Sequence, residues 1–143
     1  MESLSPDFQT IFEQAPVNYV VVDDEWRIVA ATNGYLAMAM RTREGLIGQN
    51  ILEAFPDNPD DPEAKGTEAL RSGIEQAKET RKAEWLPGAV RYPIARPEDQ
   101  GGGYEERWFR ALNAPVFDGD GNVVYVIHGN EDVTDTYSRG DRP

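Results

Sequence analysis

The sequence has no cysteine and only one histidine, His128, among its 143 residues. Without cysteine there is no disulfide framework, no thiolate metal site and no thiol nucleophile, which fits a reducing compartment. Any catalytic imidazole would have to be His128. We therefore expect no metal site and no enzymatic activity, and an enzyme that uses His128 as a general base is the weakest alternative.

Long apolar runs and basic residues are also scarce. Because no stretch reaches membrane-spanning length and no basic segment leads into an apolar one, we predict a cytoplasmic protein without a membrane span or signal peptide. The net charge of −12 opposes nucleic-acid binding. Carboxylates without a basic residue among them gather at Glu53, Asp57, Asp60, Asp61 and Glu63. They form either a patch for a divalent cation or basic partner, or a solvated loop with helix-start carboxylates, which is the interpretation that we favour.

The order of apolar patterns predicts one α+β domain. A helix from Ser5 to Gln14, with Ser5 as its N-cap, places Phe8, Ile11 and Phe12 on one face. The other patterns predict strands at 17–22 and 26–31, helices at 33–40, 43–47, 50–55 and 63–83, and strands at 86–94, 104–116 and 123–131. This order predicts an antiparallel sheet with helices on one face. We divide the chain into a flanking helix (1–15), a domain (16–134) and a polar tail (135–143).

The turn Asp118-Gly-Asp-Gly-Asn122 joins the last two predicted strands into a hairpin. It imitates the start of a calcium loop, but Val123 stands where that loop needs glycine and Gly129 where it needs the bidentate glutamate. The hairpin ends at the triplet Asp132-Val-Thr134. A carboxylate there can accept hydrogen bonds from the local backbone or from a basic side chain.

Strand alternation sorts the hairpin residues into two sets. One set contains Phe109, Ala111, Asn113, Val126, His128 and Asn130, and the other contains Trp108, Leu112, Tyr125 and Ile127. Alternation alone does not say which set faces the helices.

Three stretches together resemble the PAS family of sensory domains. They are IFEQAPVNYVVVD (11–23) with WRIVAATN (26–33), TREGLIGQN (42–50), and APVFDGDG (114–121) followed by a strand and the Asp-Val-Thr triplet. The resemblance extends from Phe8 to Thr134. It implies a PAS fold, which has a five-stranded antiparallel sheet with helices on one face, here with an N-terminal flanking helix. It also implies that Asp132 and Thr134 mark a signal exit toward an effector such as a histidine kinase.

The resemblance also implies which face of the hairpin points inward. In flavin-binding relatives, the position two before the terminal Asp faces the ligand, and here that position is Asn130. The implied pocket residues are His128, Asn130, Asn113, Phe109, Ala111, Val126, Val22 and Met38. Two hypotheses stay open: a sensor that binds a small apolar or aromatic ligand, or a ligand-free dimerisation module whose polar groups satisfy one another in a filled core.

The opposite face would need a cover, which either the N-terminal helix or a second subunit can provide. The residues assigned to this dimer or flanking-helix face are Phe8, Ile11, Phe12, Trp108, Leu112, Tyr125 and Ile127. We predict a homodimer. We expect no cofactor: covalent flavin photochemistry needs a cysteine where Ile51 stands, while non-covalent flavin and haem ligated by His128 are weaker alternatives.

Overall fold

The computed structural model describes residues 5–138. Its main sheet is antiparallel, with the strand order β2-β1-β8-β7-β3, and β4 also pairs with β7. The strands of this sheet are β1 (Tyr19–Asp23), β2 (Ile28–Ala31), β3 (Glu84–Trp85), β4 (Val90–Arg91), β7 (Trp108–Phe117) and β8 (Val123–Asp132). The predicted α+β fold with an antiparallel sheet is therefore confirmed.

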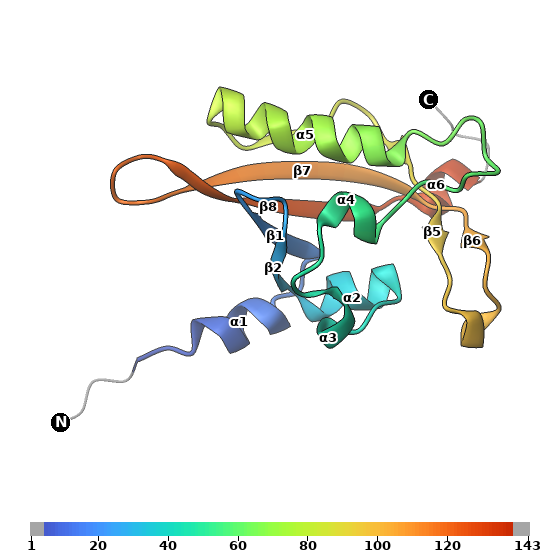
Figure 1. Cartoon of the computed structure of the whole chain (residues 1–143), viewed down its shortest axis with the longest axis horizontal. Coiled ribbons are helices and arrows are strands. Elements are labelled where there is room, and N and C mark those ends of the chain that lie inside the picture. The colour runs from blue at the N-terminus through green and yellow to red at the C-terminus, as the bar shows by residue number, and fades with distance from the viewer. Residues whose placement is uncertain (1–4, 139–143) are drawn as a thin grey trace.

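The helices are α1 (Phe8–Gln14), α2 (Asn33–Ala39), α3 (Arg43–Leu46), α4 (Ile51–Ala54), α5 (Gly66–Thr80) and α6 (Thr134–Ser138). The long helix α5 runs beside β7, whereas α2 and α3 lie near β1 and β2 (Figure 1). None of the helices within residues 5–138 has the length and apolar character needed to cross a lipid bilayer.

The two longest strands of the sheet, β7 and β8, form a hairpin. The carboxylate of Asp118 accepts hydrogen bonds from the backbone N–H groups of Asp120 and Asn122, both at 2.9 Å, and Gly121 has a φ of 85°. The predicted turn is confirmed, and its first carboxylate is used within the turn. The register pairs Asn113 with His128, which brings these two polar residues side by side.

The core lies between the sheet and the helices. Leu70, Ile74 and Ala77 form the buried stripe of α5. They join side chains of zero exposure from the strands and the shorter helices: Val20, Val22, Ile28, Leu46, Ile51 and Val126. Burial of such apolar groups is the main term that favours folding.

Asn50 caps α4. Its side-chain oxygen accepts hydrogen bonds from the backbone N–H groups of Leu52 (2.9 Å) and Glu53 (3.3 Å). We expect Asn50→Ala to lower the free energy of unfolding by about 1 kcal/mol, because the first turn loses this acceptor. Asn50→Asp keeps the acceptor and should stay close to the wild type in urea unfolding, so equal losses for both variants would contradict this role.

Several predicted boundaries are wrong. Helix α1 begins at Phe8 because the carboxylate of Asp7, rather than Ser5, accepts the N-terminal hydrogen bond from the N–H of Thr10 (3.0 Å). Helix α5 is shorter than 63–83, and it ends where Arg81 adopts a left-handed φ of 61°. Helix α6 begins at the last residue of the predicted domain and covers the first part of the predicted tail, of which residues 139–143 lie outside the described range.

The weak strand pattern at 86–94 corresponds to more than one element. Pro87 and Pro93 interrupt it, and prolines cannot donate ladder hydrogen bonds. The chain forms β3 and β4 separately and then leaves the main sheet as a second, two-stranded sheet of β5 (Ile94–Ala95) and β6 (Tyr104–Glu105). This hairpin was not predicted.

Candidate functional site: a small pocket under the long helix

The candidate site lies where β7 and β8 face α5. Alternation along both strands turns Phe109, Ala111 and Asn113 of β7, with His128 of β8, toward the interior, where all of them are buried. Asn130, further along β8, is half-buried. The set that the resemblance placed inside therefore lies on the helix side.

A hydrogen-bonded pair of buried polar side chains spans the two strands. His128 Nδ1 lies 2.8 Å from Asn113 Oδ1, and because a carbonyl oxygen only accepts, the imidazole donates from Nδ1. The amide nitrogen of Asn113 is buried and has no hydrogen-bond partner among the described residues. It lies against Gly73 of α5, where a Cβ atom would come within 2.5 Å of it. A side chain at position 73 would therefore have to displace the Asn113 amide.

Burial keeps the imidazole uncharged. It lowers the pKa of His128 from 6.5 to about 4, and a hydrogen bond with Asn130 opposes this shift. At neutral pH the pocket therefore offers neutral polar groups in an apolar setting, which suits an uncharged ligand better than an ion.

The cavity beside His128 is small, at about 20 Å³. Its lining includes residues of α5, of the segment that carries β3 and β4, and of the β7–β8 hairpin: Gly66, Ala69, Leu70, Leu86, Val90, Tyr92, Phe109, Ala111, His128 and Asn130. Such a volume holds roughly one water molecule. Ligands of drug size occupy about 300 Å³ or more.

Tyr92 forms part of the lining of this cavity. Its ring packs on Gly66 at the start of α5, where a Cβ atom would come within 2.3 Å of the ring. Its hydroxyl donates to the carbonyl of Phe55 and lies 3.3 Å from Thr67 Oγ1. Burial raises the pKa of Tyr92, so the phenol stays protonated. The place of Tyr92 was not predicted, because a tyrosine in a proline-interrupted segment shows no periodicity that reveals where it points.

The other predicted pocket residues lie away from the cavity. Val22 and Val126 are fully buried in the apolar core. Met38 is half-buried, and its sulfur accepts a weak hydrogen bond from Asn18 Nδ2 at 3.6 Å. The structure thus gathers Phe109, Ala111, His128 and Asn130 around the cavity, with Asn113 behind His128.

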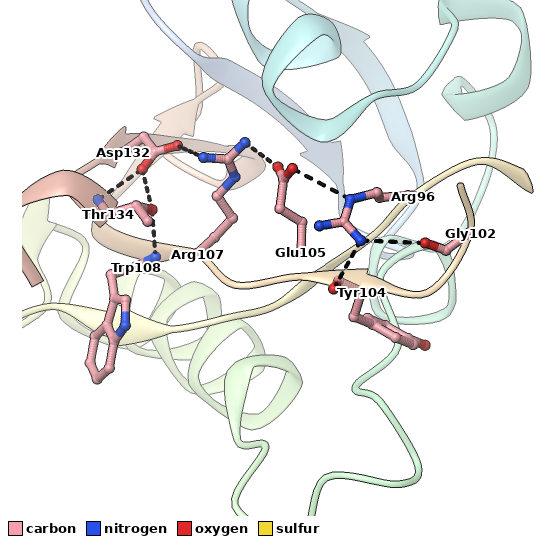
Figure 2. Close-up of polar contacts among 8 residues, drawn as sticks. All are labelled: Arg96, Gly102, Tyr104, Glu105, Arg107, Trp108, Asp132 and Thr134. Atoms are coloured by element: carbon pink, nitrogen blue, oxygen red, sulfur yellow. Dashed lines mark hydrogen bonds and ion pairs between the residues drawn. The ribbon is translucent and has the colours of Figure 1, made fainter. Parts of the chain in front are cut away.

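The Asp132-Val-Thr134 triplet fixes the end of β8 to the first turn of α6. The backbone N–H of Thr134 donates to Asp132 Oδ1 at 2.9 Å, and its hydroxyl donates to the same oxygen. The Trp108 N–H donates to Thr134 Oγ1 at 3.0 Å, and Arg107 Nη1 lies 3.5 Å from Asp132 Oδ2 (Figure 2). The hydrogen bonds expected for Asp132 are present.

The opposite face of the sheet is partly exposed. Tyr125 is 41% exposed, and Leu112 and Ile127 are half-buried. Helix α1 contacts α2 and β2 and leaves Phe8 72% and Ile11 58% exposed. Its Phe12 is half-buried.

Two carboxylates of the acidic stretch are used within the fold, while Glu53, Asp60 and Glu63 are exposed. Asp61 pairs with Arg91 at 2.7 Å, and Asp57 accepts a hydrogen bond from the N–H of Thr67 at 3.1 Å. In the part of the chain that the structure describes, no group of three or more His, Asp or Glu side chains has the arrangement needed to hold a metal ion.

A family model described as "PAS fold" matches residues 12–138, which is most of the chain. The chain belongs to the PAS family. A PAS domain from Colwellia psychrerythraea is similar in structure, with a TM-score of 0.65 and 20% identity over 88% of this chain and 93% of that one. A sensor histidine kinase structure from Vibrio cholerae has a TM-score of 0.59 and 17% identity over 88% of each chain. No curated protein matches the sequence.

Light-oxygen-voltage domains are also similar to this PAS domain. One, from a study of a flavin analogue, has a TM-score of 0.60 and 25% identity over 89% of this chain and 84% of that one. The cavity of about 20 Å³ beside His128 is smaller than the tricyclic ring of a flavin.

Proposed function

We propose that this PAS domain senses a small, uncharged apolar or aromatic molecule between α5 and the sheet, and passes the change to an effector such as a histidine kinase. One observation carries the proposal: neutral His128 and Asn130 meet in an otherwise mostly apolar pocket, and the ring of Tyr92 forms part of its lining. A mostly apolar pocket with a few convergent polar groups is the usual form of a small-molecule site.

Tyr92 is the side chain that a ligand would displace. It is held by hydrogen bonds to the Phe55 carbonyl and Thr67 and by packing on Gly66, contacts that an incoming ring can replace. Its departure would join the space of its own ring to the present cavity. Because part of the binding free energy is used to displace Tyr92, the apparent affinity falls with the population of the open form.

This proposal predicts that p-cresol, the side-chain analogue of tyrosine, binds to Tyr92→Ala. We expect the variant to bind it at least about 10-fold more tightly than the wild type, because the closed state no longer competes. Calorimetry and a rise in melting temperature measure the effect. Adding Asn130→Ala should weaken binding.

Tyr125→Ala is the matched control, because it removes an exposed tyrosine from the opposite face of the sheet. It should bind p-cresol no better than the wild type. If Tyr92→Ala keeps a native circular dichroism spectrum and does not bind p-cresol at millimolar concentration, the ligand proposal is wrong.

The second candidate function is a ligand-free module with a filled core, and the small volume of the cavity favours it. In that case the Asn113–His128 pair is structural, and one water completes the site. This module would act through association with another chain.

The remaining assignments belong to the same proposal. Asp132 and Thr134 would form the signal exit, and residues 16–134 the sensory unit, with 1–15 as a flanking segment and the residues after 134 as the connection to the effector. The exposed Phe8, Ile11 and Tyr125 support a homodimer. A sensory rather than catalytic role agrees with the pKa of His128, which is too low for a general base at neutral pH. We also assign the domain to the cytoplasm.

A further inference from the structure

The β5–β6 hairpin is an arm that stands apart from the main sheet. Its strands pair Ile94 with Glu105 and Ala95 with Tyr104. Its tip contains a short 3-10 helix (Glu98–Gln100) and three consecutive glycines, 101–103, all with positive φ. The arm extends away from α5 (Figure 1).

A chain of alternating charges leads from this arm to the end of β8. Arg96 Nε lies 3.5 Å from Glu105 Oε1, and the other oxygen of Glu105 pairs with Arg107. Arg107 Nη1 in turn approaches Asp132 Oδ2 at 3.5 Å, and Asp132 holds Thr134 (Figure 2). The side chains of the four charged residues in this series are each about one-third exposed: Arg96, Glu105, Arg107 and Asp132.

Further contacts hold each end of this series of charged residues. At the arm, the N–H of Arg96 donates to the Gly103 carbonyl at 2.8 Å, and its guanidinium reaches the carbonyls of Gly102 and Tyr104 at 3.5 and 3.4 Å. At the other end, the ring of Tyr137 in α6 stacks on Trp108, with ring centroids 5.2 Å apart. A shift of the arm therefore moves the carboxylate that positions Arg107.

We propose that the arm is a lever whose position is transmitted to the start of α6 through Arg96, Glu105, Arg107 and Asp132. Arg107 lies between two carboxylates, so its distance to Glu105 affects its pairing with Asp132. This gives the domain a second input that is separate from the pocket under α5. The inference does not depend on a pocket ligand, so its failure would leave the proposed function untouched.

Glu105→Gln tests the lever, because it weakens the contacts with both Arg96 and Arg107. We expect the backbone amides of Val133, Thr136 and Tyr137 to exchange hydrogen about 5-fold faster, measured by NMR on the free protein. Each of these amides donates a hydrogen bond at the β8–α6 junction.

Glu106→Gln is the matched control, because Glu106 is the next residue and pairs with Arg91 (2.7 Å) instead. It should leave the amides of Val133 and Tyr137 unchanged. Equal acceleration by both variants, or acceleration confined to the arm amide of Arg96, would overturn the proposal.

Gly102→Val tests transmission from the tip. Gly102 has a φ of 62° and open space around it, so valine strains the tip backbone without a clash. It should accelerate exchange at Val133 and Tyr137 in the wild type but add nothing in the Glu105→Gln background. Equal, additive effects in both backgrounds would show that Glu105 does not carry the coupling.

Discussion

Replacing Gly73 with alanine is expected to lower the free energy of unfolding by about 2–3 kcal/mol, although alanine is the better helix former. The new Cβ atom would lie 2.5 Å from the Asn113 amide nitrogen. Asn113 is 2% exposed and bound to His128, so it cannot move aside without breaking a buried hydrogen bond. Overpacking and the unpaired imidazole outweigh the helix-propensity gain of about 1 kcal/mol.

Ser72→Ala provides the control for this prediction, because Ser72 is the exposed neighbour on α5. Urea unfolding of this variant should differ from the wild type by less than about 0.5 kcal/mol. Shortening Asn113 to alanine in the Gly73→Ala protein should recover part of the loss. A Gly73→Ala protein as stable as the wild type would mean that Asn113 is not held in place.

Acidification from about pH 7 to pH 4.5 is expected to remove about 2 kcal/mol of stability through His128 alone. The pKa of His128 is about 4 in the folded protein, against 6.5 for an exposed imidazole. Between these two pKa values the unfolded state therefore binds a proton that the folded state does not bind. The contribution of His128 to stability is fully present above the unfolded pKa. It declines as pH falls toward the folded pKa, below which the loss levels off.

His128→Gln should flatten this part of the pH profile, because the chain contains no other histidine. Glutamine keeps a donor for Asn113 without a titratable ring. Urea unfolding at several pH values compares the two proteins. If both lose the same stability between pH 7 and pH 4.5, carboxylates rather than His128 cause the loss.

The sequence predicted the parts of the fold that repeat with a fixed period. Alternation along β7 and β8 separated Asn113 and His128 from Leu112 and Tyr125, and the turn at Asp118 fixed their register. The family resemblance then supplied the direction that alternation lacks, because it placed Asn130 inward. The stripe of Leu70, Ile74 and Ala77 on α5 follows the same logic.

Features that depend on long-range packing were not predictable in this way. Tyr92 reaches the pocket only because Gly66, 26 positions earlier, offers no side chain to the ring. Helix α6 forms in a polar sequence that has no apolar period, where Tyr137 stacks on Trp108. The volume of the pocket, which bears on both functional hypotheses, has no signature in the sequence.

Native mass spectrometry of the freshly purified domain, compared with its denatured mass, tests the central claim that this pocket binds a small molecule. The account predicts an added mass that disappears on denaturation. The double variant His128→Gln, Asn130→Ala should lack this added mass, whereas Tyr125→Ala should retain it. A bare polypeptide mass, together with no rise in melting temperature across a panel of uncharged aromatic metabolites, would contradict it and establish the filled core.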